Sequence, residues 1–197
     1  MRKILPSAQK EAIEVLDKGG ILAIPTETVF GLAVKLDNTP AIRKLLELKK
    51  RDKSSGKMLT LMVADTKHVS KYAEVTPRAD YLMRRYFPGE LTLVLPKQAS
   101  FRHPYFDNFD TIGVRIPDHE FSLELLRATG PLLVTSANLR GESPCTRSAE
   151  IIRKLPKVDG VIKGVSGNNL PSTIIDLTDD QPETLRQGGL LIVRFAA

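Results

Sequence analysis

The stretch that decides the fold is "IPTETVFGLAVKL", residues 24–36, in which a polar centre separates two apolar segments. Apolar flanks are typical of buried strands, and residues 21–24, "ILAI", form a short apolar run. A core strand offers no partners for Thr26, Glu27 and Thr28, because polar side chains are costly to bury unpaired. We therefore predict a buried strand that is followed by a polar segment at the edge of a sheet.

Outward from this stretch, helical and strand patterns alternate along the chain. Apolar residues at helical spacing predict helices over residues 7–18, 39–51, 76–87, 119–130 and 147–156, with Thr39 and Thr76 as N-caps before prolines. Apolar runs predict strands over residues 57–64, 90–96, 111–117, 131–138, 160–165, 172–177 and 189–195. Consecutive strands near the end favour an α/β layered fold with a mixed parallel and antiparallel sheet. Residues 1–197 show no repeat or linker, so we expect a single domain.

The composition excludes several classes of protein. Without Trp, the chain is poorly supplied with stacking platforms for single-stranded nucleic acid. One cysteine, Cys145, and three scattered histidines supply neither a disulfide framework nor the ligands of a structural zinc site. We see no signal peptide and no run of about 18 apolar residues, so we expect a cytoplasmic protein without a membrane segment.

The net charge of +6 and the pI near 9.5 bear on the partners of the chain. A basic protein attracts anionic molecules such as nucleotides, pyrophosphate or RNA. Mild basicity also serves solubility alone, so the charge does not choose among these partners.

Polar segments recur at the ends of predicted strands. "PTET" follows the first strand, "TSAN" follows "LLV" at residues 132–134, "PST" precedes "IIDL", and "KKRDKSSGK" lies between a helix and a strand. Singly, each segment could be an ordinary turn, N-cap, strand start or solvated loop. Together they gather hydroxyl, amide and cationic groups where the loops of α/β sheets converge, which predicts a site for a polar, anionic ligand.

These segments belong to seven motifs whose order resembles that of the YrdC-like family of L-threonylcarbamoyladenylate synthases, over essentially the whole chain. The motifs of this sequence are "GGILAIPTETVFGLAV", "ELKKRD", "YFPGELTLVLP", "TIGVRIPDH", "VTSANLRGESPCT", "PSTIIDL" and "TLRQGGL". The sequence departs from the family pattern at Phe30, where tyrosine is usual, at Asp52 for a proline, at Arg140 for a serine, and near Met62, where many relatives have a histidine.

The resemblance implies an activity and a fold. Such enzymes combine L-threonine, bicarbonate and ATP into threonylcarbamoyladenylate and release pyrophosphate. A partner transferase complex then modifies an adenosine of certain tRNAs. The implied fold is an α/β domain with a twisted mixed sheet, flanking helices and a concave basic cavity, in the single-domain form. Mg²⁺ is expected to arrive with ATP, whose phosphates supply most of its ligands, and we expect no dedicated metal site.

Motif matching implies the site residues. Lys49, Arg51 and Arg115 are the expected catalytic residues, because anionic reactants call for electrostatic clamping. Threonine and bicarbonate are expected to contact Thr28, Arg115, Ser136 and Ser172. ATP is expected to contact Lys49, Arg51, Lys57, Thr111, Asn138, Thr146 and Arg186. Arg115 could instead form a structural ion pair.

Two alternatives stay open on the sequence alone. Glu27 could orient or deprotonate the threonine ammonium, or it could brace one of the basic residues. The whole chain could also be a non-catalytic paralogue that binds double-stranded RNA or tRNA through the basic cavity, with strong salt dependence. A carbamoyl-transfer enzyme with another acceptor ranks last, because the further domains of such proteins are absent from these 197 residues.

Overall fold

We describe the fold from a computed structural model, in which residues 1–50 and 58–192 are described. The α-helices are α1 (Gln9–Asp17), α2 (Thr39–Leu48), α3 (Pro77–Tyr86), α4 (Glu120–Thr129) and α5 (Ser148–Lys154), and a 3₁₀ helix, η2, spans Thr66–Lys71. The strands are β1 (Arg2–Ile4), β2 (Leu22–Ile24), β3 (Gly31–Lys35), β4 (Thr60–Met62), β5 (Leu91–Pro96), β6 (Thr111–Arg115), β7 (Leu132–Ser136), β8 (Gly160–Ile162), β9 (Thr173–Asp176) and β10 (Glu183–Arg186).

The strands of the described residues form one sheet in the order β1-β8-β2-β3-β7-β4-β6-β5-β9-β10. The pairs β1–β8, β2–β8, β4–β6 and β5–β9 are parallel, and the remaining neighbours are antiparallel. The predicted mixed sheet is therefore confirmed.

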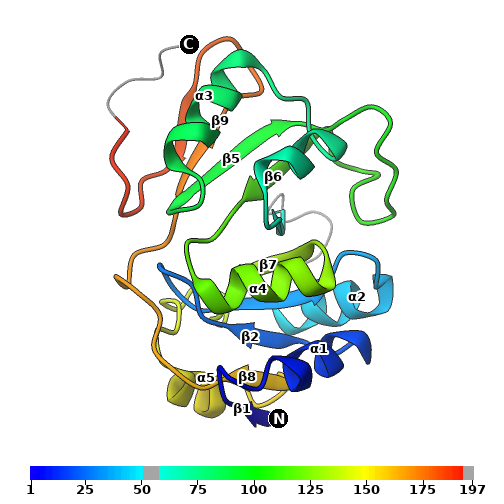
Figure 1. Cartoon of the computed structure of the whole chain (residues 1–197), viewed down its shortest axis with the longest axis vertical. Coiled ribbons are helices and arrows are strands. Elements are labelled where there is room, and N and C mark those ends of the chain that lie inside the picture. The colour runs from blue at the N-terminus through cyan, green and yellow to red at the C-terminus, as the bar shows by residue number, and fades with distance from the viewer. Residues whose placement is uncertain (51–57, 193–197) are drawn as a thin grey trace.

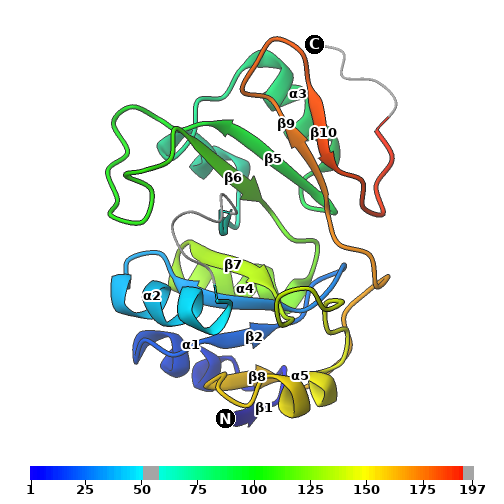
Figure 2. The same ribbon diagram turned by 180° about the vertical axis from the view of Figure 1, so that it is seen from behind.

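The sheet has two halves, which Figures 1 and 2 show from opposite sides. The lower half contains β1, β8, β2, β3 and β7, the upper half contains β6, β5, β9 and β10, and β4 bonds to both through β7 and β6. Helices α1 and α4 pack together on one face of the lower half, whereas α2 covers the other face (Figure 2). Helix α3 packs on β5 in the upper half.

Strand β3 shows how the sequence builds two cores. Leu32 and Val34 enter the larger apolar cluster with α2, while Ala33 enters the smaller cluster with α1 and α4. Because successive strand residues face opposite sides, a continuous apolar run is what a strand covered on both faces requires. The stretch quoted at the outset therefore turns from β2 into the antiparallel β3, with its polar residues at the bend.

Two expectations about the elements are corrected, and one strand was missed. Asn38, not Thr39, caps α2, because its Oδ1 accepts a hydrogen bond of 3.0 Å from the Ala41 amide. The predicted strand over residues 189–195 is not formed up to residue 192, beyond which it lies outside the described residues, and β10 occurs earlier, at Glu183–Arg186. Strand β1 was not predicted, because a segment of three residues carries little pattern.

The prediction that Thr76 caps α3 is confirmed by its hydrogen bond of 3.2 Å from the Ala79 amide. Among residues 1–50 and 58–192, none of the helices has the length and apolar character needed to cross a bilayer.

Candidate active site

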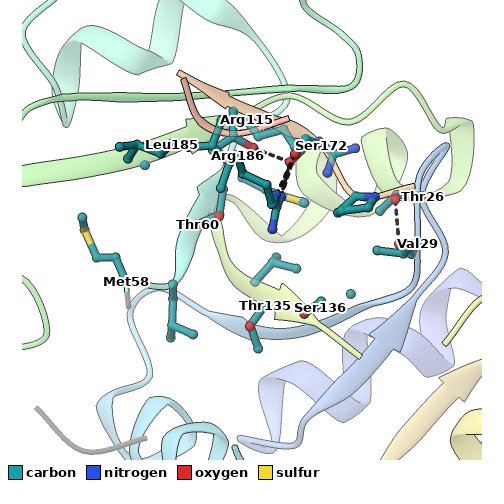
Figure 3. Close-up of a pocket in the computed structure, with 18 of the residues that line it drawn as sticks. Thr26, Val29, Met58, Thr60, Arg115, Thr135, Ser136, Ser172, Leu185 and Arg186 are labelled. Atoms are coloured by element: carbon teal, nitrogen blue, oxygen red, sulfur yellow. Dashed lines mark hydrogen bonds between the residues drawn. The ribbon is translucent and has the colours of Figure 1, made fainter. Parts of the chain in front are cut away.

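A cavity of about 800 Å³ lies between the two halves of the sheet (Figure 3). Thr135 and Ser136 of β7 lie on one side of it, and Arg115 and Arg186 lie on the opposite side. Thr60 belongs to β4, which pairs with β7. Its volume is within the usual range for small-molecule sites. The cationic residues among its described lining are Lys49, Arg115, Arg140 and Arg186.

Arg115 is held at the end of β6 by the polar segment between β2 and β3. Its Nη2 donates to Glu27 Oε1 at 2.7 Å and to Thr28 Oγ1 at 2.8 Å, and its Nε donates to the Gly89 carbonyl at 3.2 Å. The side chains of Arg115 and Glu27 are only 6% and 16% exposed, so this is a largely buried ion pair. Glu27 is therefore the brace of a basic residue, the second of its two predicted roles.

A hydroxyl chain continues from Arg115 toward the main chain. Thr26 Oγ1 donates to the Val29 carbonyl at 2.8 Å, so the 2.8 Å bond between Thr26 and Thr28 takes its proton from Thr28. Thr28 in turn accepts from Arg115. Thr28 is fully buried and does not line the cavity, whereas Thr26 does (Figure 3). Thr28 thus orients Arg115, and its predicted contact with threonine stays a prediction.

Arg186, the second arginine of the cavity, is held by Ser172. Its Nε and Nη2 donate to the Ser172 carbonyl at 3.0 and 2.8 Å, and Nη2 also reaches Ser172 Oγ at 3.0 Å (Figure 3). Ser172 Oγ also bonds to Thr92 Oγ1 at 2.8 Å. Burial lowers the pKa of Arg186, and repulsion by Arg115 lowers it further. Because both effects disfavour the guanidinium charge, an anion in the cavity would relieve them.

Lys49 connects the end of α2 to the segment after β7. Its Nζ donates to the carbonyls of Ser136 at 2.8 Å and Asn138 at 2.5 Å, and to Asn138 Oδ1 at 2.7 Å. Asn138 Oδ1 also accepts from Ser136 Oγ at 2.7 Å. The ammonium group therefore fixes the conformation of "TSAN" and places its charge beside the cavity.

The structure brings most of the predicted site residues together. Those that line the cavity are Lys49, Arg115, Thr111, Ser136, Asn138, Ser172 and Arg186. Thr146 is not part of the lining: its amide donates to Glu150 Oε2 at 2.8 Å, and its carbonyl accepts from the Ser166 amide at 2.8 Å. Arg51 and Lys57 lie outside the described residues.

Sequence reasoning missed several lining residues, namely Thr60, Thr92, Thr135, Asp176 and Leu185. The signal that could have found them is the alternation of side chains along each strand. Thr92 shares its sheet face with Val94, and Gly113 shares that of Arg115, because residues two apart in a strand point the same way.

The described residues contain no group of three or more His, Cys, Asp or Glu side chains that could hold a metal ion. Asp176 is the single carboxylate in the described lining.

Comparison with known proteins finds relatives over most of the chain. A threonylcarbamoyl-AMP synthase of Vibrio campbellii is 35% identical over 185 residues, covering 91% of this chain and 98% of the relative. One from Bacillus subtilis is 34% identical and likewise covers 91% of this chain, but the chain spans only 53% of that relative. This chain therefore corresponds to nearly all of one relative and to about half of the other.

The crystal structure of Pyrococcus abyssi Sua5 complexed with L-threonine superposes with a TM-score of 0.86 at 30% identity, over 96% of this chain and 57% of that one. Residues 14–188 match the profile of the Sua5/YciO/YrdC family, which is described as "Telomere recombination". The match spans most of the sequence and includes Arg115, Arg186 and the residues that bind them. The chain therefore belongs to the Sua5/YciO/YrdC family.

Proposed function

We propose that this chain is a threonylcarbamoyl-AMP synthase, an enzyme that joins L-threonine, bicarbonate and ATP and releases pyrophosphate. Relatives at 34–36% identity carry this name, and P. abyssi Sua5 binds L-threonine. The observation that carries the proposal is the convergence of Arg115, Arg186 and Lys49 with the hydroxyls of Thr26, Ser136 and Ser172 in one cavity. Such a site suits reactants that are all anionic or zwitterionic.

The chemistry requires two bonds to form. The threonine nitrogen attacks the bicarbonate carbon, which forms the N–C bond of the carbamate and releases water. A carbamate oxygen then attacks the α-phosphorus of ATP, and the bond from that phosphorus to pyrophosphate breaks. Because AMP is transferred to an oxygen acceptor, the enzyme is a nucleotidyltransferase. The protein contributes positioning and charge stabilisation rather than a covalent intermediate.

The geometry suggests a division of the site. Arg115, preset by Glu27 and Thr28, would bind the threonine carboxylate or bicarbonate beside Ser136 and Ser172. Lys49 and Arg186 would neutralise the phosphates, with Arg51 and Lys57 from the neighbouring segment. The remaining nucleotide contacts that we expect are Thr111, Asn138 and Thr146. When bound with ATP, Mg²⁺ supplies charge neutralisation to the phosphates.

The product would then pass to a transferase complex that modifies tRNA, in the cytoplasm. We expect this transfer to involve no membrane and no further cofactor bound in the cavity.

The test is to incubate the purified chain with ATP, threonine and bicarbonate and to measure pyrophosphate and threonylcarbamoyl-AMP by mass spectrometry. We expect release only when all three substrates are present, and a strong loss in Arg115→Gln. Arg2→Gln is the matched control, because Arg2 forms an exposed ion pair with Glu14. Threonine-independent release, or none from folded protein, would overturn the proposal. Salt-sensitive binding of double-stranded RNA without synthesis would favour the paralogue instead.

A further inference from the structure

The charges of the cavity are unevenly distributed. Four cationic residues belong to its described lining, against one carboxylate, that of Asp176. Asp176 is the last residue of β9 and ends the motif "PSTIID". The roles proposed above for this motif do not involve the Asp176 carboxylate. A ligand that fills this cavity would therefore meet several cations and a single carboxylate acceptor.

The sheet register gives the position of Asp176. It pairs with Val94 of β5, which pairs with Gly113 of β6, two residues before Arg115. At about 4.8 Å per strand and about 3.4 Å per residue, the α-carbons of Asp176 and Arg115 lie roughly 12 Å apart on one face. A ligand that contacts both residues must therefore span a distance of this order.

The carboxylate is oriented but not neutralised. Asp176 Oδ1 accepts from the Thr178 amide at 2.9 Å and from Thr178 Oγ1 at 2.6 Å. Within residues 1–50 and 58–192, Asp176 forms no ion pair with a Lys or Arg side chain. Glu183 lies opposite Asp176 in register and is exposed, but it is not part of the lining. The charge of Asp176 is thus available to a donor in the cavity.

The surface between Asp176 and Arg115 leaves room for such a ligand. An added Cβ on Gly113 would meet a single neighbour within 4 Å, Thr92 Cγ2 at 3.8 Å. The φ of Gly113 is not in the left-handed region, so neither packing among the described residues nor the backbone calls for glycine here. A side chain at this position would instead project into the cavity, over the path from Arg115 to Asp176.

We propose that the Asp176 carboxylate accepts a hydrogen bond from the ribose 2′-hydroxyl of the nucleotide and so makes the site selective for ribonucleotides. The inference rests on the proposed function in taking ATP as the ligand. A carboxylate is a suitable acceptor, because an acidic residue at the end of a strand binds the ribose 2′-hydroxyl in other α/β nucleotide sites. Asp176 is then a specificity-determining residue, whereas Lys49 and Arg186 hold the phosphates.

The test is calorimetric binding of ATP and of 2′-deoxy-ATP, which needs no turnover and so stands apart from the test of synthesis. The wild-type chain should bind ATP about 10- to 100-fold more tightly, the range expected for a hydrogen bond to a charged group. Asp176→Ala should lose most of this preference by weakening ATP binding alone. Asp176→Asn, which keeps an oxygen for Thr178, guards against misfolding and should lose part of it.

Asp179→Asn is the control, since it removes the same charge from an exposed neighbour. An equal affinity of the wild type for both nucleotides would overturn the proposal. It would also be overturned if Asp176→Ala weakened both nucleotides equally, or if it changed the Mg²⁺ requirement while the preference stayed, because the carboxylate would then act as a general charge or as a metal ligand. A chain that fails to synthesise product but shows the predicted preference would refute the proposed function and keep this inference.

Discussion

At the residue scale, the site depends on charges that the protein has already paired. Glu27 and Arg115 form their ion pair almost out of contact with water, where the energy of removing one partner is much larger than the net energy of the pair. Glu27 Oε2 is buried and has no hydrogen-bond partner among the described residues. The carboxylate therefore has capacity for one more donor.

Glu27→Gln tests this pairing. The amide keeps the shape but leaves the Arg115 charge without its counter-ion, so we expect the free energy of unfolding to fall by about 2–4 kcal/mol. Urea denaturation measures the change. In Glu14→Gln, which breaks an exposed pair with Arg2, the change should stay within about 0.5 kcal/mol. If the two variants lowered the free energy of unfolding equally, the buried pair would contribute no more to stability than the exposed one.

His119 predicts a pH dependence of stability. Burial lowers the pKa of its imidazole, against the raising effect of Glu27, Glu120 and Asp118, and its buried Nδ1 has no partner among the described residues. The unfolded chain then takes up this proton at a higher pH than the folded one, so stability falls as the pH drops through about 6.5. Melting temperatures at about pH 7.5 and about pH 5.5 should differ more for the wild type than for His119→Gln. Identical differences would show that this histidine has no part in the acid sensitivity.

At the element scale, β3 and β7 bring the polar turn and "TSAN" side by side. Gly31 pairs with Ser136, and an added Cβ on Gly31 would lie 2.6 Å from Val134 Cγ1. Glycine is therefore needed at the start of β3 because the side chain of β7 occupies the space. The requirement for glycine at this position thus comes from close packing between β3 and β7.

Gly31→Ala should accordingly lower the free energy of unfolding by about 1–3 kcal/mol through overpacking. The double variant with Val134→Ala should lose less than the sum of the two single variants, because the second change removes the atom that clashes. Chemical denaturation of the four proteins measures this coupling. Strictly additive changes would argue against the contact.

The sequence predicted most of the secondary-structure elements and several residues of the cavity, but not all of their contacts. Most helices and strands followed from periodicity, and motif order brought Lys49, Arg115, Ser136 and Arg186 to one cavity as predicted. Motif order could not show that the Arg115 guanidinium lies over Thr28 and so leaves the hydroxyl fully buried. That arrangement depends on β6 crossing near the β2–β3 turn, a tertiary contact that local pattern does not specify.

At the scale of the whole molecule, the cavity is built by both halves of the sheet. Ser136 belongs to the lower half, and Arg115 and Arg186 belong to the upper half (Figures 1 and 3). A ligand that contacts both would bind the folded chain and not the unfolded one, so its binding free energy adds to stability.

ATP should therefore raise the melting temperature, by roughly 5–10 °C at about 100 times its dissociation constant. The shift should shrink as salt is added, because the repulsion between Arg115 and Arg186 that the phosphates relieve is electrostatic. Thermal melts with adenosine are the matched control, since adenosine lacks the phosphates. If adenosine raised the melting temperature as much as ATP does, Arg115 and Arg186 would not contribute to nucleotide binding through the phosphates.

The pairing of β1 with β8 also governs how the chain reaches this fold. Arg2–Ile4 are made well before their partners, Gly160–Ile162, which emerge from the ribosome more than 150 residues later. Such distant pairing slows folding, since the chain must close a long loop before the contact stabilises it. The nascent protein therefore carries β1 without its partner until β8 has been made. The strand is short and carries the positive charges of Arg2 and Lys3, and both features disfavour pairing of its free edge with other chains.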